Sequence, residues 1–153
     1  MEIIDLLKRI YPEDEVFVHN PIFHENLPIL KVACMVPKGR GYALKPVPYI
    51  TAENYVRILS QASYLLAFYI IQNNLLDIKI SVRDFLQALD GFQLYYRNLS
   101  LIFHERVERG KVFEMELNLK NARVIRNLHD FIIFTFTNKR TVISGEMSFV
   151  YIG

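Results

Sequence analysis

One segment constrains the fold of this chain more than any other: the stretch from Tyr49 to Ile71 reads as one long helix. Its beginning is polar, with Thr51, Glu53 and Asn54, but its second half is apolar on nearly every face. A surface helix keeps a polar stripe, whereas a helix that is apolar all round must be enclosed by other elements. The sequence therefore predicts a buried central helix whose polar start stays accessible.

The elements around this helix predict how it is enclosed. After Gly91 we expect four strands, at Leu94–Val107, Lys111–Leu119, Phe131–Thr137 and Thr141–Ile152. Hairpin turns are expected at Glu108–Gly110 and Asn138–Arg140. Before the long helix we expect a short helix at Met1–Ile10, a loop marked by Asn20–Pro21 and Asn26–Pro28, and a strand at Ile29–Val36. A second short helix is expected after it, at Ser81–Gly91. Runs of consecutive strands favour an antiparallel α+β fold. The prediction is one domain, residues 1–153, in which an antiparallel sheet wraps around one long central helix, as in the hot-dog fold.

Composition and charge exclude several classes of protein. The chain is 52% hydrophobic, and its net charge of +2 is too small for nucleic-acid binding to be expected. Its longest apolar run, Tyr64–Ile71, is far shorter than the ~20 residues that span a bilayer. The single cysteine, Cys34, cannot form an internal disulfide, which fits a reducing compartment. We expect a cytoplasmic protein without a membrane span.

The polar start of the long helix is the candidate catalytic site. Backbone N–H groups at a helix N-terminus, here near Thr51, stabilise negative oxygen such as that of an attacked thioester carbonyl. The carboxylate of Glu53 can activate water as a general base, and Asn54 can orient that water or hold the carbonyl. The alternative is that Thr51 and Glu53 only cap the helix and favour its dipole.

Further along the helix, other polar residues are candidates for substrate binding. Ser60, Gln61 and Ser63 either line a polar pocket or bond locally to the backbone, and Tyr64 is a further candidate for binding the substrate. Arg57 needs a carboxylate, a phosphate or a solvent edge, because an unpaired buried charge is costly. A pocket that runs along the helix from Thr51 toward Tyr64 would accept a fatty acyl chain.

The loop before the helix adds further candidates. Tyr42 and Tyr49 flank the helix start, where they can offer hydroxyls to a thioester or simply pack as aromatics. Lys38, Arg40 and Lys45 can bind the phosphates of coenzyme A or an acidic carrier protein, or they form a solvated loop.

Other chemistries find little support in the sequence. Asn20–His24 approximates the Asn-Pro-Ile-His element of MaoC-like hydratases, but Phe23 spoils the spacing. His24 is nevertheless the best candidate for a general base outside the helix. No metal-ligand spacing, Gly-x-Ser-x-Gly elbow, P-loop or dinucleotide fingerprint is present, so we expect no metal.

Three parts of the chain resemble the FcoT-type fatty acyl-CoA thioesterases, a branch of the hot-dog superfamily. They are Gly41–Tyr64, Ser81–Gln87, and Phe113–Leu117 together with Ser144–Met147. The resemblance implies long acyl chains carried on coenzyme A or carrier protein, and no metal or redox cofactor. It is not complete: Ser60 and Thr51 stand where the family has Asn, and Tyr42 matches with a one-residue shift.

The resemblance implies an acyl-CoA or acyl-carrier thioester-binding protein, a fatty acyl-CoA thioesterase-like enzyme. One alternative is a non-catalytic, regulatory acyl-CoA-binding protein, because a strong acid–base pair is missing. A lesser alternative is an enzyme that adds to enoyl thioesters, such as a hydratase. A homodimer is expected in each case, because a single hot-dog sheet leaves an edge strand and an open site that a two-fold partner completes.

Overall fold

The computed structural model describes residues 4–39, 47–126, 130–138 and 142–152. These residues form one antiparallel sheet with the strand order β1-β2-β4-β5-β6-β3. The strands are β1 (Val18–Phe23), β2 (Ile29–Cys34), β3 (Leu94–Phe103), β4 (Phe113–Arg126), β5 (Asp130–Asn138) and β6 (Ile143–Ile152). The helices are α1 (Asp5–Lys8), α2 (Ala52–Gln72) and α3 (Val82–Asp90), and η1 (Glu13–Glu15) is a short 3-10 turn.

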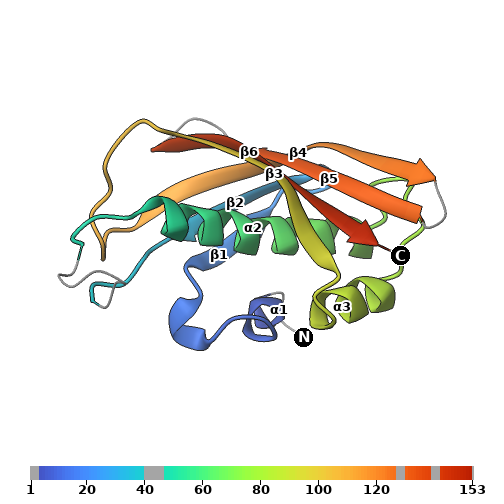
Figure 1. Cartoon of the computed structure of the whole chain (residues 1–153), viewed down its shortest axis with the longest axis horizontal. Helices are drawn as coiled ribbons and strands as arrows, with labels where there is room; N and C mark the ends of the chain where they lie inside the picture. Colours follow the sequence, from blue (N-terminus) through green and yellow to red (C-terminus); the bar gives the residue numbers. More distant parts are fainter. Residues whose placement is uncertain (1–3, 40–46, 127–129, 139–141, 153) are drawn as a thin grey trace.

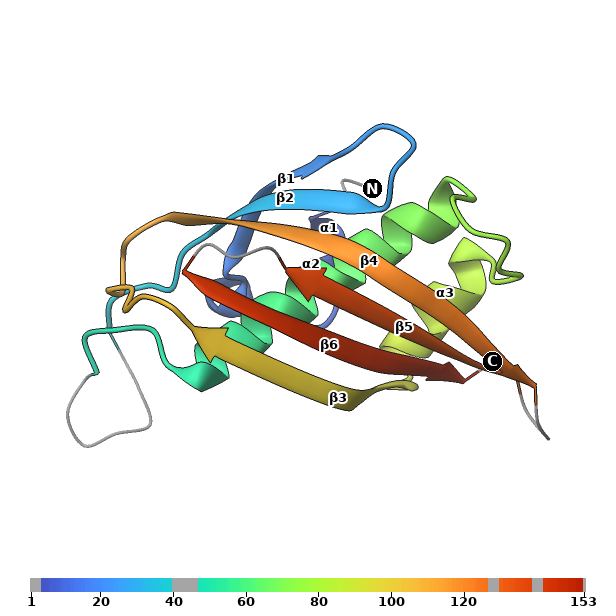
Figure 2. The ribbon, with the colours of Figure 1, turned by 90° about the horizontal axis from the view of Figure 1, so that it is seen from above.

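The long helix α2 lies across the inner face of the sheet (Figures 1 and 2). All its residues from Ile58 to Phe68 are buried. The opposite side of α2 faces α1 and α3 (Figure 1), and the ring centroid of Phe85 in α3 lies 6.5 Å from that of Phe68. The predicted enclosure of a central helix by an antiparallel sheet is confirmed.

The predicted helix starts are also confirmed. α2 begins directly after Thr51, and α3 begins after Ser81, whose Oγ accepts a hydrogen bond from the N–H of Asp84 at 3.1 Å. Such caps satisfy N–H groups that have no partner within the helix. The N-terminal helix is shorter than predicted, Asp5–Lys8, while residues 1–3 lie outside the described part of the chain.

The loop that Asn20–Pro21 and Asn26–Pro28 predict is confirmed only between β1 and β2, around Asn26–Pro28. Its predicted start at Asn20–Pro21 is wrong, because β1 runs through both residues. β1 is an edge strand that pairs with β2 alone, and its register shifts between His19 and Ile22. Asn20 has a φ of 48°, so the chain forms a bulge there. A bulge on an edge strand tolerates proline, which has no N–H to donate to a neighbouring strand.

The hairpin predicted at Glu108–Gly110 is wrong in its pairing. β3 pairs with β6, whereas β4 pairs with β2 and β5, so the strands before and after this turn lie apart in the sheet. β3 ends at Phe103, and the following connection passes the start of α2 through an isolated bridge between Tyr49 and Glu108. The connection thereby helps to build the site described below.

The remaining strand predictions hold with different bounds. β4 continues to Arg126, beyond the predicted end of this strand at Leu119. β5 and β6 pair as a hairpin, as predicted, with Asn138 opposite Gly145, although residues 139–141 lie outside the described ranges. Among the described helices, none is long and apolar enough to cross a membrane.

Candidate functional site

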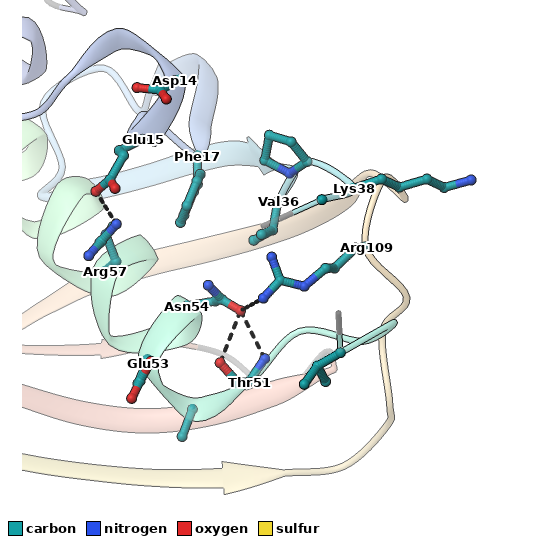
Figure 3. A pocket seen from close by; sticks show the side chains of 14 residues that line it. Asp14, Glu15, Phe17, Val36, Lys38, Thr51, Glu53, Asn54, Arg57 and Arg109 are labelled. Carbon is teal, nitrogen blue, oxygen red and sulfur yellow. Dashed lines mark hydrogen bonds and ion pairs between the residues drawn. The ribbon is translucent and has the colours of Figure 1, made fainter. Parts of the chain in front are cut away.

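A pocket of about 970 Å³ opens at the N-terminal end of α2 (Figure 3). Its walls come from four segments that lie far apart in the sequence: residues 14–17 around η1, residues 36–39 after β2, the first turns of α2 as far as Arg57, and Arg109. The pocket therefore coincides with the polar helix start at which the sequence predicts the site.

Backbone hydrogen bonds hold these segments together. The N–H of Ile50 donates to the carbonyl of Val107 at 2.8 Å, and the N–H of Arg109 donates to that of Pro48 at 3.0 Å. The N–H of Gly110 donates to the carbonyl of Val36 at 2.7 Å. The connection between β3 and β4 thus binds both the end of the β2 segment and the approach to α2, and it fixes Arg109 at the helix start.

Thr51 and Asn54 are brought together at this helix start. The side-chain oxygen of Asn54 accepts hydrogen bonds from the N–H and the hydroxyl of Thr51, both at 3.0 Å, and from Nη2 of Arg109 at 3.2 Å. With three donors on the Asn54 oxygen, the side-chain group that Asn54 has left to offer a ligand is its amide N–H.

Glu53 also lines the pocket, but it occupies a different part of it. Figure 3 shows the Glu53 carboxylate on another side of α2 from Asn54 and Arg109, and the residue is exposed. The structure therefore does not place Glu53 and Asn54 against each other. A carboxylate in this position can still reach a water molecule at the open side of the pocket.

Arg57 forms the opposite wall together with the residues of η1. Its guanidinium makes an ion pair with Glu15 and lies 5.8 Å from the ring centroid of Phe17. Of the carboxylate, phosphate or solvent edge that the sequence leaves open for Arg57, the structure shows the carboxylate. The charge of Arg57 is thus balanced before any ligand binds.

Ser60, Gln61 and Tyr64 lie outside the pocket lining and have partners within the protein. Gln61 Oε1 accepts from the N–H of Phe17 at 2.8 Å, and its Nε2 donates to the carbonyl of Glu15 at 2.7 Å. Gln61 therefore anchors the segment that leads into β1. Ser60 donates to the carbonyl of Val56 at 2.7 Å, and its hydroxyl also contacts that of Tyr96.

Three tyrosines lie around Ser60. The sequence indicates only Tyr64 as a candidate, because Tyr11 and Tyr96 come from distant segments. Burial raises the pKa of the Tyr11, Tyr64 and Tyr96 phenols, so all three stay neutral at physiological pH. Tyr96 is 43% exposed as a residue, but its hydroxyl points inward to Ser60. The ring of Tyr64 packs edge-on against Phe149, with ring centroids 5.8 Å apart.

The candidates in the preceding loop divide into two groups. Tyr42, Arg40 and Lys45 lie outside the described residues. Lys38 lines the pocket and is exposed. Tyr49 is 39% exposed beside the pocket, and its ring lies 5.5 Å from the guanidinium of Arg106.

The histidines that the structure describes lie away from the pocket lining. His24 is an exposed residue next to β1, and its Nδ1 lies 2.7 Å from the carbonyl of Glu25. The Nε2 atom of His104 lies 2.7 Å from the hydroxyl of Ser144. Within the described ranges, no three histidine, cysteine or acidic side chains are grouped to hold a metal ion.

Arg109, like Asp14 and Glu15, is a pocket residue that the sequence does not indicate. The sequence shows only an arginine in a polar turn, and its role depends on a crossover that the local pattern does not predict. Its Nε is buried without a hydrogen-bond partner.

Comparison with known proteins identifies the fold. No family model and no curated protein sequence matches the chain. Among solved structures, a thioesterase-superfamily protein from Shewanella loihica matches with a TM-score of 0.51 at 8% identity, over 94% of this chain and 96% of its own. An uncharacterised protein from Pyrococcus horikoshii matches with a TM-score of 0.50 at 9% identity, over 91% and 85%. A 4-hydroxybenzoyl-CoA thioesterase bound to 4-hydroxybenzoyl-CoA has a TM-score of 0.43 at 12% identity, over 82% and 84%.

The chain therefore has the hot-dog fold, in agreement with its antiparallel sheet and its central helix. At these identities the likeness establishes the fold, and the activity has to be deduced from the residues of the pocket.

Proposed function

We propose that this chain binds acyl thioesters of coenzyme A or of an acyl carrier protein in the cytoplasm and hydrolyses them, as the FcoT-type fatty acyl-CoA thioesterases do. The observation that carries this proposal is the pocket of about 970 Å³ at the start of a helix that extends from Ala52 to Gln72. The first N–H groups of a helix have no partner within the helix, so they are available to a ligand oxygen.

In the proposed reaction the thioester carbonyl lies against the N–H groups of Ala52 and Glu53. The Glu53 carboxylate accepts a proton from water, whose oxygen attacks the carbonyl carbon. The helix N–H groups and the Asn54 amide stabilise the oxyanion that forms. The C–S bond then breaks, and the thiolate of the carrier leaves and takes up the proton. Thr51 fixes the Asn54 side chain through the two hydrogen bonds described above.

The acyl chain is proposed to extend along α2 toward Tyr64. The apolar character of this part of α2 suits a fatty acyl group. The described pocket extends along α2 only as far as Arg57, so a long chain requires the side chains between Arg57 and Tyr64 to move apart.

A second candidate function is binding without turnover, as in a regulatory protein that senses acyl-CoA. The position of Glu53 favours it, because this carboxylate is exposed and lies on a different side of α2 from Asn54 (Figure 3). The two functions share the same pocket and differ only in whether thiol is released.

A panel of acyl-CoAs of graded chain length tests both functions. Binding is measured by calorimetry, and release of free CoA thiol is measured with a thiol reagent. Binding with release supports the hydrolase, and binding without release supports the regulatory alternative. If no acyl-CoA and no acyl carrier protein binds, both proposals are wrong.

We further propose that two copies associate through β3. This strand is at an edge of the sheet and pairs with β6 alone. Large apolar side chains are exposed along it: Tyr95, Tyr96, Leu99, Ile102 and Phe103. An unpaired, apolar edge strand is a template for another strand, and two antiparallel copies of β3 form a two-fold symmetric contact.

A charged substitution on β3 tests this association. Leu99 is 37% exposed, and Leu99→Glu is expected to shift a dimer toward monomer at micromolar concentration, because two like charges would approach each other at the two-fold contact. Val112→Glu, at a residue that is 68% exposed before β4, is the matched control and should leave the dimer intact. Sedimentation equilibrium measures the association of both variants. A wild-type protein that is still monomeric at about 50 μM would contradict the proposal.

A further inference from the structure

Arg109 has more hydrogen-bonding capacity than its surroundings use. A guanidinium carries five N–H donors and cannot be deprotonated in a protein. Nη2 donates to the neutral side chain of Asn54 at 3.2 Å, while Nε is buried and has no acceptor. In the part of the chain that the structure describes, Arg109 makes no ion pair. A charged donor left in this state is costly, so a partner from outside the chain would stabilise it.

Two other arginines of the chain have acidic partners, the half-buried Arg57 and the exposed Arg9. Arg57, in the same pocket, pairs with Glu15, and Arg9 pairs with Asp90, with its Nε 3.0 Å from Oδ1. These two arginines have structural partners. The backbone of Arg109 is fixed by the hydrogen bond from its N–H to the carbonyl of Pro48, but its side chain has no acidic partner among the described residues.

The surroundings of Arg109 favour an anion on its side of the pocket. The positive N-terminal end of α2 lies next to it, and the stem of Lys38 packs over Gly110, the next residue in the chain. Figure 3 shows the Lys38 ammonium extending outward, so it adds positive charge at the mouth of the pocket and no direct contact inside. The acidic residues of η1, Asp14 and Glu15, lie on the other side of the pocket, beside Arg57 (Figure 3).

We infer that Arg109 binds an anionic oxygen group of the ligand and so selects ligands that carry one. A planar guanidinium can bind a carboxylate or a phosphate through two parallel hydrogen bonds. The inference rests on the proposed function, since the ligand is the acyl thioester of the same pocket. The anionic group is a phosphate of the pantetheine-nucleotide carrier, because the acyl chain is proposed to extend the other way, along α2 toward Tyr64.

Three thioesters test whether the bound group is a phosphate. Octanoyl-CoA carries phosphates and a neutral acyl chain, S-octanoylpantetheine carries neither a phosphate nor a carboxylate, and the CoA thioester of octanedioic acid carries both. Arg109→Gln is compared with the wild type and with Arg123→Gln, which removes the same charge from an exposed residue of β4 outside the pocket lining. Dissociation constants are measured by calorimetry.

If a phosphate is bound, Arg109→Gln weakens both CoA thioesters about tenfold or more and leaves the pantetheine thioester unchanged. If the variant weakens only the dicarboxylate thioester, the bound group is an acyl carboxylate and the assignment to a phosphate is wrong. Arg123→Gln changes no affinity beyond about twofold. Equal affinities of wild type and Arg109→Gln for all three thioesters would overturn the inference.

Small anions separate this inference from the proposed function. Inorganic pyrophosphate and glutarate are titrated into the wild type and both variants, and amide shifts are followed by NMR. If no thioester binds but Arg109→Gln weakens binding of either anion about tenfold, the thioester function is wrong and the anion site stands. If neither anion nor any thioester distinguishes the variant from the wild type, the anion site is wrong.

Thermal unfolding excludes a purely structural role. Because Arg109→Gln removes a charged donor that lacks an acceptor, its melting temperature should equal or exceed that of the wild type. A melting temperature more than about 4 °C lower would show that Arg109 stabilises the fold and would contradict the inference.

Discussion

Replacing Phe149 by Ala is expected to lower the free energy of unfolding by about 3–5 kcal/mol. Phe149 is fully buried in β6, and its ring centroid lies 5.2 Å from that of Phe134 and 5.5 Å from that of Phe136. Its ring also contacts Tyr64, so it joins the sheet to α2. Truncation removes apolar burial and leaves a cavity between two layers that cannot easily close.

Chemical denaturation with urea measures this effect. Phe92→Ala is the control, because Phe92 is 81% exposed and its loss should change stability by less than about 0.5 kcal/mol. If the two variants unfold at the same urea concentration, the packing of α2 against the sheet at Phe149 is not as described.

The second large effect is expected at Glu53. Glu53→Gln keeps the size of the side chain but removes the group that accepts the proton from water. The rate of CoA release should fall by about 10²–10⁴-fold, which is the usual contribution of a general base. Affinity for the acyl-CoA should stay within about twofold, because a base that acts on water contributes little to ground-state binding.

The matched control for Glu53→Gln is Glu25→Gln. Glu25 is exposed beside the β1–β2 turn and does not line the pocket, so this variant removes an equal charge without touching the site. A Glu53→Gln variant that hydrolyses acyl-CoA at the wild-type rate would exclude Glu53 as the base. The proposed hydrolysis would then need another proton acceptor.

The central helix shows why much of this fold is predictable from sequence. An apolar surface on all sides of a helix can be satisfied only by enclosure, and the polar residues at Thr51 and Asn54 mark its start. The strand composition after Gly91 then leaves a sheet as the enclosing element. Such local patterns determine which elements form, but they do not determine which strands pair.

The errors arise where tertiary contacts decide the outcome. The turn at Glu108–Gly110 has the composition of a hairpin, yet β3 is more favourably paired with β6, where Leu99 lies opposite Met147. Asn20 and Pro21 have the composition of a loop, yet an edge strand can accommodate them as a bulge. In both cases the residue types are correct for a turn, and the neighbours in space are not visible in the sequence.

The same distinction between local patterns and tertiary contacts applies to the candidate site. Thr51, Glu53, Asn54, Arg57 and Lys38 were identified from the sequence because they belong to the helix start or to the segment before it, and all of them line the pocket. Arg109 was not, because only the crossover between β3 and β4 carries it there.

The most direct test is to locate a bound thioester analogue by NMR. A thioether analogue of octanoyl-CoA, which cannot be hydrolysed, is titrated into isotopically labelled protein, and the amide resonances of α2 are followed. The proposed site predicts saturable shifts that are largest at the N–H groups of Ala52, Glu53 and Asn54. Saturable shifts confined to residues outside the pocket, or no saturable shift at any concentration, would contradict a thioester site at the start of α2.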